Sequence, residues 1–421
     1  MVRKESHVRW FIVVLLFFVT MVNYIDRASI AYAINAIESE FRLSPSEVGS
    51  ILGVFGLGYG LSTFLGGLAA DHLGAKRTLV WATLGWMAAT VLLGCANGFL
   101  VIMIARLSLG LSEGANFPGM TRALSDWLPE NERGRALSFA LIAVPLALAL
   151  GGPLVSSLIT YTSWRVTYFI LAGIVLLWVP VWIIYFRDNP ADSSHVNPKE
   201  LEHIRDKAQV RTQTKLKYPT NPWSILLRNK TLLANYWAFF VFGFYLFFFM
   251  TWLPEYLHKT YDLTLMKTGL YTFFPWLLGA LLMWGCGHLT DRIFMHTKNL
   301  RWSRSYPIII SQLLAALSVL PIIFIRQIDT AIIFISLAVG FTMSPNAAFY
   351  AVNIDVIKER AGTALGIMEL MFALSGFFAP TLTGCIVSWS GHFEAVFWVL
   401  AGLGLSSTVT TWFFHNTAKR D

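Results

Sequence analysis

A small set of ionisable side chains lies inside long apolar stretches of the sequence. The five are Asp26, Arg27, Arg106, Glu113 and Glu369. An ionised group costs several kcal/mol in an apolar environment, so it persists where it is paired, hydrated or used. Arg106 and Glu113 are seven residues apart, and two helical turns place them on one face, about 10 Å apart along the axis. Asn116 continues this face by one further turn.

These residue types indicate how the set could bind a solute. An arginine guanidinium stays charged and grips a carboxylate through two parallel hydrogen bonds, so Arg27 or Arg106 could hold an anionic group. A carboxyl in a half-dry cavity can change its protonation state when a nearby cation or ligand changes. Asp26 and Glu113 could therefore bind and release a proton. The alternative is a static network of charges that joins two helices.

The composition predicts that most of the chain is surrounded by lipid. Of 421 residues, 56% are hydrophobic and 13% are charged, and the mean hydropathy is +0.58. A soluble domain carries about 25% charged residues. The net charge of +8 lies in loops between apolar runs, where it indicates orientation in a membrane and not a nucleic-acid site. The three cysteines show no metal-ligand spacing, so we expect neither a metal nor a cofactor.

Twelve apolar runs are long enough to cross a hydrocarbon layer of about 30 Å. They cover residues 10–34, 47–70, 78–95, 98–118, 136–159, 166–186, 231–253, 267–290, 306–325, 330–353, 362–388 and 394–414. If both termini are cytoplasmic, the cytoplasmic segments hold 25 Lys or Arg residues and the external loops hold 5. This asymmetry is a strong orientation signal. The sequence thus predicts a multi-pass protein of the cell inner membrane with cytoplasmic termini.

The predicted fold class is an all-α membrane protein with twelve transmembrane helices in two pseudo-symmetric six-helix bundles. We expect an N-terminal bundle at residues 1–190, a cytoplasmic linker at 191–224 and a C-terminal bundle at 225–421. The linker is polar and carries Pro198, Pro219 and Pro222. A short surface helix could begin at Pro198, and we expect the linker to be solvated.

One loop pattern occurs twice. Residues 67–77 (GLAADHLGAKR) close the second span and residues 287–292 (GHLTDR) close the eighth, with their Asp residues 220 positions apart. Internal repeats of this kind accompany alternating access about a central site. Each Asp could pair with a base or cap a helix, and such pairs would gate the cytoplasmic side; a plain turn is the alternative. The predicted gating residues are Asp71, Lys76, Arg77, Asp291 and Arg292.

These motifs resemble the major facilitator superfamily, and its anion:cation symporter branch in particular. Beyond the two loops, the resemblance rests on NYIDR at 23–27, RxxxGxxEG at 106–114 with Pro118, WLP at 127–129, ERGR at 132–135, WR at 164–165, WLP at 252–254 and RAGT at 360–363. It covers nearly the whole chain. The order and spacing of the motifs together are more specific than any one of them.

The resemblance also implies roles for single residues. In sugar-acid symporters of this branch, the residues that match Asp26 and Glu113 are the protonation sites. Two arginines help to bind or gate, and two tyrosines line the substrate site; interhelical packing is the alternative for the tyrosines. With the polar residues noted above, the predicted substrate-binding set is Tyr24, Arg27, Tyr59, Arg106, Asn116 and Glu369.

The sequence departs from that branch at two positions. Relatives place a Gln on the fifth span and an Asn on the eleventh against substrate hydroxyls, whereas the matching positions here are Val144 and Ala373. A site without these amides is less suited to a polyhydroxylated acid. Glu369, one turn before Ala373, could face the cavity as an added acid or lie in water near the cytoplasmic mouth.

We therefore expect a proton-coupled symporter that imports a small organic anion, such as a sugar acid, a polycarboxylate or a carboxylate-type siderophore, by alternating access. We expect a monomer in the lipid bilayer with no nucleic-acid partner. A proton-driven exporter or drug antiporter of the same fold is the runner-up, and a non-transporting membrane receptor is a third possibility. An enzyme is not expected, because the sequence has no nucleotide loop and no nucleophile with a base.

Overall fold

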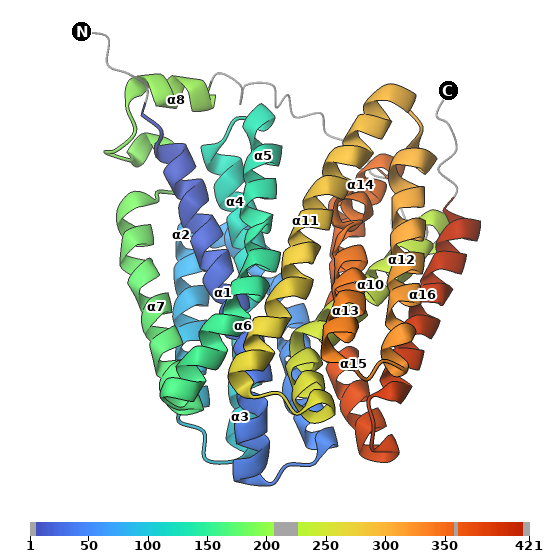
Figure 1. Ribbon diagram of the computed structural model, residues 1–421. Coiled ribbons are helices and arrows are strands. Elements are labelled where there is room, and N and C mark those ends of the chain that lie inside the picture. The colour runs from blue at the N-terminus through green and yellow to red at the C-terminus, as the bar shows by residue number, and fades with distance from the viewer. Residues whose placement is uncertain (1–5, 206–225, 358–360, 416–421) are drawn as a thin grey trace. The chain divides into compact units, whose positions relative to one another are not determined.

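The computed structural model describes residues 6–205, 226–357 and 361–415, and its regular elements there are helices (Figure 1). The helices are α1 (Val8–Phe41), α2 (Pro45–Gly94), α3 (Phe99–Glu113), α4 (Asn116–Trp127), α5 (Glu130–Leu141), α6 (Ala143–Tyr161), α7 (Trp164–Tyr185), α8 (Pro198–Arg205), α10 (Lys230–Tyr261), α11 (Leu265–Thr297), α12 (Tyr306–Val319), α13 (Ile328–Met343), α14 (Asn346–Val356), α15 (Ala361–Ser390) and α16 (Glu394–Phe414).

Within the described ranges, eleven helical segments are long and apolar enough to cross a membrane. One of them, α2, has 50 residues, which is about 75 Å at 1.5 Å per residue and more than twice the thickness of a hydrocarbon core. It therefore accounts for two of the twelve predicted spans. The break expected between residues 70 and 78 is found as a kink at Gly74, whose backbone (φ 81°, ψ 163°) is not helical, a conformation that glycine adopts without a steric penalty.

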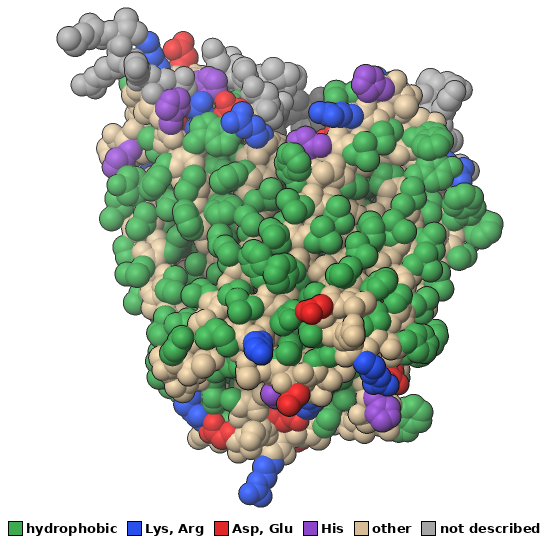
Figure 2. All heavy atoms as spheres, viewed as in Figure 1, with side chains coloured by type: hydrophobic (Ala, Val, Ile, Leu, Met, Phe, Trp, Pro, Cys, Tyr) green, Lys and Arg blue, Asp and Glu red, His purple; other side chains and the backbone are tan. Residues whose placement is uncertain are grey.

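Apolar side chains cover the outer faces of the helices. Figure 2 shows them over the middle of the helices, while charged side chains gather near the helix ends. Large hydrophobic side chains such as Leu177, Phe64 and Phe324 are 73%, 69% and 71% exposed. Exposure of this kind is unfavourable in water and is expected for helices that face lipid.

The chain divides into two compact units. The first comprises Met1–Arg27, Leu57–Ala147 and Thr162–Lys215, and the second comprises Ala28–Gly56, Leu148–Tyr161 and Leu216–Asp421. Each unit therefore takes parts of α1, α2 and α6. The predicted division into bundles at residues 190 and 225 stays a prediction, and residues 206–224 of the predicted linker lie outside the described residues.

The helix predicted to begin at Pro198 is α8, and it is more than a solvated surface element. The carboxylate of Glu200 is fully buried and accepts hydrogen bonds from the Ser6 hydroxyl at 2.6 Å and from the backbone N–H groups of Val8 and Arg9 at 3.1 and 3.0 Å. The Arg9 guanidinium donates to Glu200 at 3.2 Å and to Glu132 at 3.0 Å. Glu200 thus caps the free N–H groups at the start of α1, beside which α8 lies in Figure 1.

Glu200→Gln is expected to lower the thermal stability of the protein. The amide replaces a charged acceptor of four donors with a neutral group that can accept from only some of them, so we expect a loss of about 2 kcal/mol or more. The measurement is the melting midpoint in detergent. Glu202→Gln, on an exposed side chain of the same helix, is the matched control with an expected change of less than about 0.5 kcal/mol. Equal small shifts in the two variants would refute the capping role.

Candidate functional site

Arg27 lies at the centre of a buried cluster in the first unit. Its Nε donates to Glu113 Oε2 at 2.9 Å and its Nη2 donates to Asn23 Oδ1 at 3.1 Å. Its guanidinium carbon lies 4.4 Å from the centroid of the Tyr24 ring and 4.7 Å from that of Tyr59. The cation is therefore held by an ion pair, an amide and two aromatic faces, each of which favours its charged form.

Asp26 and Arg106 belong to the same cluster. Asp26 Oδ2 accepts a hydrogen bond from Thr90 Oγ1 on α2 at 2.5 Å. The Arg106 guanidinium attracts both Asp26 and Glu113 electrostatically. Thr90 is a contact that sequence reasoning missed, because a lone hydroxyl in an apolar span gives no signal of its partner.

Close helix packing brings these side chains together. A Cβ added to Gly58 on α2 would lie 2.4 Å from the carbonyl oxygen of Leu107, and one added to Gly114 would lie 2.6 Å from that of Tyr59. Only glycine permits such approach of two backbones. The two glycines therefore seat α2, which carries Tyr59, against α3, which carries Arg106 and Glu113.

Two polar groups in or next to the cluster keep unused hydrogen-bonding capacity. Asn116 is 1% exposed, and neither polar atom of its amide has a hydrogen-bond partner among the described residues. The same holds for Glu113 Oε1. The ring of Phe117, next to Asn116, lies 6.3 Å from that of Tyr24, so the start of α4 borders the Arg27 site.

In this structure the cluster is buried. Asp26, Arg27, Arg106 and Glu113 are each 0–1% exposed, so the half-dry cavity expected around the two carboxyl groups is not seen in the part of the chain that the structure describes. The physical reason is that the groups neutralise one another: two carboxylates face two guanidiniums, and paired charges tolerate burial where single charges do not.

Glu369 lies in the second unit. Its Oε1 accepts a hydrogen bond from the Tyr350 hydroxyl at 2.7 Å, and the side chain is half-buried. Its place in the substrate site stays a prediction. Val144 and Ala373, the two positions that lack the amides of the related symporters, are both buried.

The first predicted gating loop pairs with residues outside the predicted set. Asp71 lies 3.5 Å from Arg122, which also donates to Asp126 at 3.0 Å. The backbone N–H of Lys76 donates to Asp188 at 2.9 Å, and this carboxylate caps the helix after the bend at Gly74. The side chain of Arg77 is exposed.

The second gating loop shows a similar arrangement. Asp291 lies 3.6 Å from Arg304, and Arg304 also donates to Asp355 at 3.2 Å, while the side chain of Arg292 is exposed. In each loop the partner of the Asp comes from another helical segment and not from the adjacent base. Sequence reasoning missed these partners because spacing along one chain segment says nothing of a neighbouring segment.

Comparison with known proteins identifies the family. The model of the major facilitator superfamily matches residues 16–349 and 299–421. A probable sulfoacetate transporter of Cupriavidus necator is 30% identical, over 95% of this chain and 91% of its own length. A hexuronate transporter of Bacillus subtilis is 28% identical, over 94% and 92%. A probable galactarate/D-glucarate transporter of Escherichia coli is 28% identical, over 93% and 90%.

Solved structures share the fold at lower identity. A bacterial homologue of the human lysosomal transporter Spinster superposes with a TM-score of 0.76 at 15% identity, over 98% of this chain and 95% of that one. A D-xylose-proton symporter superposes with a TM-score of 0.75 at 16% identity, over 96% and 97%. The predicted fold class is confirmed, and the named relatives are transporters and not enzymes. The chain belongs to the major facilitator superfamily.

Proposed function

We propose that this protein is a proton-coupled symporter that imports a small organic anion by alternating access. The observation that carries the proposal is the buried ion pair between Arg27 and Glu113. An incoming anion would compete with Glu113 for the Arg27 guanidinium. A proton on Glu113 would weaken the same pair and leave Arg27 to the anion. Each ligand therefore favours the binding of the other, which is the coupling that symport requires.

Charge balance supports this coupling. Asp26 and Glu113 balance Arg27 and Arg106 in a buried cluster, and a net charge at such depth is costly. A monoanion alone would leave the cluster with one excess negative charge, and a proton alone with one excess positive charge. Both together restore neutrality. We infer one proton for each negative charge on the substrate.

The relatives support the substrate class. Sulfoacetate, hexuronate, galactarate and glucarate, the solutes in their names, are all small organic anions with a carboxylate. The planar fork of Arg27 suits a carboxylate or sulfonate. The Asn116 amide can both donate and accept a hydrogen bond. We therefore propose that it binds a polar group of the substrate other than the carboxylate or sulfonate that Arg27 holds. The apolar Val144 argues for a compact anion with few hydroxyls. From the excess of Lys and Arg in the predicted cytoplasmic segments, we also propose an inner-membrane location with cytoplasmic termini.

Thermal shift on the purified protein tests the substrate class. Sulfoacetate is expected to raise the melting temperature more than the polyhydroxylated glucuronate and galactarate, since a ligand at 100 times its Kd adds about 2.7 kcal/mol of stability. The shift should be larger at an acidic than at a mildly alkaline pH, because the proton-bound cluster is the one that needs an anion for neutrality. Glucose is the matched neutral control for glucuronate. A melting-temperature shift by lipophilic cations alone would contradict the proposal and favour a drug antiporter.

A further inference from the structure

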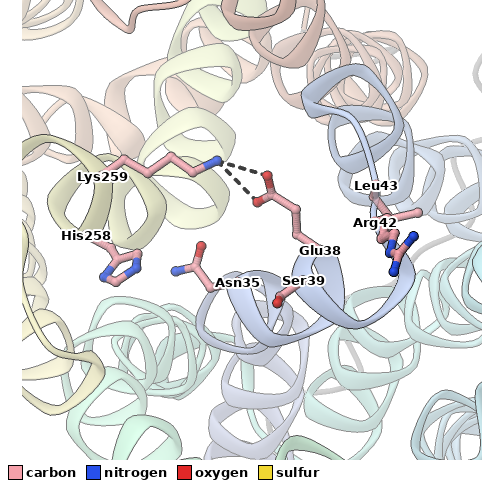
Figure 3. Close-up of a pocket in the computed structure, with 7 residues that line it drawn as sticks. All are labelled: Asn35, Glu38, Ser39, Arg42, Leu43, His258 and Lys259. Atoms are coloured by element: carbon pink, nitrogen blue, oxygen red, sulfur yellow. Dashed lines mark hydrogen bonds and ion pairs between the residues drawn. The ribbon is translucent and has the colours of Figure 1, made fainter.

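An ion-pair triad joins α1 and α10 away from the Arg27 cluster. Lys259 Nζ lies 3.0 and 3.2 Å from the two carboxylate oxygens of Glu38 on α1. It also lies 2.6 Å from Glu255, one turn earlier on α10. Figure 3 shows the ion pair between Lys259 and Glu38 at the edge of a pocket. The pocket has a volume of about 510 Å³ and is lined by Asn35, Glu38, Ser39, Arg42, Leu43, His258 and Lys259. All these residues belong to the second unit.

Two pairs of helices pack closely in the same unit, and each of these two contacts is called a seam below. In the first, α2 meets α15, where a Cβ added to Gly49 would lie 2.9 Å from the Cα of Gly384. In the second, α6 meets α11, where a Cβ added to Gly152 would lie 2.9 Å from the carbonyl oxygen of Gly269. The Tyr32 hydroxyl of α1 lies 2.8 Å from that of Thr272 on α11. Segments 28–56 and 148–161 are thus closed against the helices that follow residue 230.

We infer that these two seams form a closed gate at the helix ends where residues 41–45 connect α1 to α2. We further infer that the ion pairs of Lys259 control the opening of this gate. Lys259 has one carboxylate partner on each side of the gate. Glu38 moves away with α1 when the gate opens, whereas Glu255 stays beside Lys259 because both residues are on α10. When the gate opens, Lys259 loses Glu38 but keeps Glu255, so the cation is never left without a counter-charge. The inference rests on the alternating access of the proposed function and names the residues that control it.

The burial of the three groups fits this division of roles. The Glu255 side chain is 1% exposed, whereas those of Glu38 and Lys259 are 21% and 41% exposed. Glu255 is therefore a fixed buried partner, and Glu38 is a partner that water can replace at low cost. Glu38 and Glu255 also repel each other electrostatically, so the closed state needs the lysine between them.

This arrangement predicts opposite effects for two isosteric substitutions. Glu38→Gln removes the partner that is lost on opening, so the gate should open more often. Glu255→Gln leaves Glu38 as the sole partner in the triad, so opening would strand Lys259 and should become rarer. Lys259→Gln leaves two carboxylates to repel each other in the closed state and should open the gate at least as much as Glu38→Gln.

The measurement is the rate at which a maleimide labels a reporter cysteine at Ser156. Ser156 is fully buried and contacts Gly269 across the α6–α11 seam. The reporter is placed in a variant whose Cys95, Cys286 and Cys385 are replaced by serine, and the purified protein needs no substrate. We expect labelling about two- to five-fold faster than the parent in Glu38→Gln and Lys259→Gln, and slower by a similar factor in Glu255→Gln.

Whether Glu255→Gln slows or speeds the labelling of the reporter cysteine decides between a switch and a purely structural role for the triad. A triad that merely stabilises the fold would loosen in every variant, so faster labelling in Glu255→Gln would overturn the switch. Unchanged labelling in both Glu38→Gln and Lys259→Gln would overturn the gate. Loss of substrate binding plays no part in this readout, so the proposed function and this inference can fail separately.

Discussion

Glu113→Gln is expected to abolish proton-driven accumulation of the anion while leaving its binding intact. The glutamine carbonyl can still accept the hydrogen bond that Arg27 Nε gives to Glu113 at 2.9 Å, so the site keeps its shape. The amide cannot take up a proton, and it resembles the protonated acid in charge. The variant is therefore fixed in the form that binds the anion.

The size of the effect follows from the coupling. If one proton moves with each monoanion, no net charge crosses the membrane, and only the pH difference drives accumulation. One pH unit corresponds to about 1.4 kcal/mol, or a tenfold accumulation. In proteoliposomes the unmodified protein should reach this ratio, and Glu113→Gln should equilibrate the anion to a ratio near one. Exchange of labelled for unlabelled anion should persist in both.

Binding in Glu113→Gln should also lose its pH dependence. In the unmodified protein, anion affinity should rise as the pH falls and Glu113 takes up its proton. In the variant it should stay at the high level over the same range. Glu394→Gln, an exposed carboxylate in the first turn of α16, is the matched control and should behave as the parent. Continued uphill transport by Glu113→Gln would exclude Glu113 as the coupling site and leave Asp26 as the candidate.

Sequence reasoning reached the fold because its signals are local. Apolar runs of membrane length and charged loops predict helices and their order without knowledge of any contact. The break between the second and third spans was predicted, because charged residues and glycine at 71–77 interrupt two apolar runs; only its form, a kink at Gly74, was not. The cap on α1 was missed because Glu200 follows Val8 by 192 residues, and no pattern near either residue records the other.

The sequence predicts which residues form the candidate site, but it does not predict which of them pair with each other. Asp26, Arg27, Arg106 and Glu113 stand out because ionisable groups are costly in apolar spans. Which carboxylate meets which arginine depends on the rotation and spacing of α1, α2 and α3. These follow from contacts such as that between Gly58 and Leu107, which the sequence does not encode in any single segment.

Arg27→Lys is expected to weaken binding of the anion by roughly 10- to 100-fold, the loss of one charge-assisted bidentate contact of about 1.5–3 kcal/mol. Lysine keeps the positive charge and therefore keeps Glu113 neutralised. It lacks the planar fork that meets Glu113 and Asn23 at once and that lies between the rings of Tyr24 and Tyr59. Calorimetry with the anion gives the affinity. Arg165→Lys, an arginine that stacks on the Trp164 ring at 4.0 Å, is the control.

A structural role for Arg27 predicts a different pattern. Arg27→Ala strands the buried Glu113 carboxylate, and breaking such a pair costs about 3–5 kcal/mol of stability. Replacing both partners by apolar residues, Arg27→Met with Glu113→Leu, should restore much of that stability, since apolar pairs often match buried ion pairs. If Arg27 binds the anion, the double variant is stable and does not bind. If the double variant or Arg27→Lys binds with unchanged affinity, the pair only holds α1 against α3, and the anion site lies elsewhere.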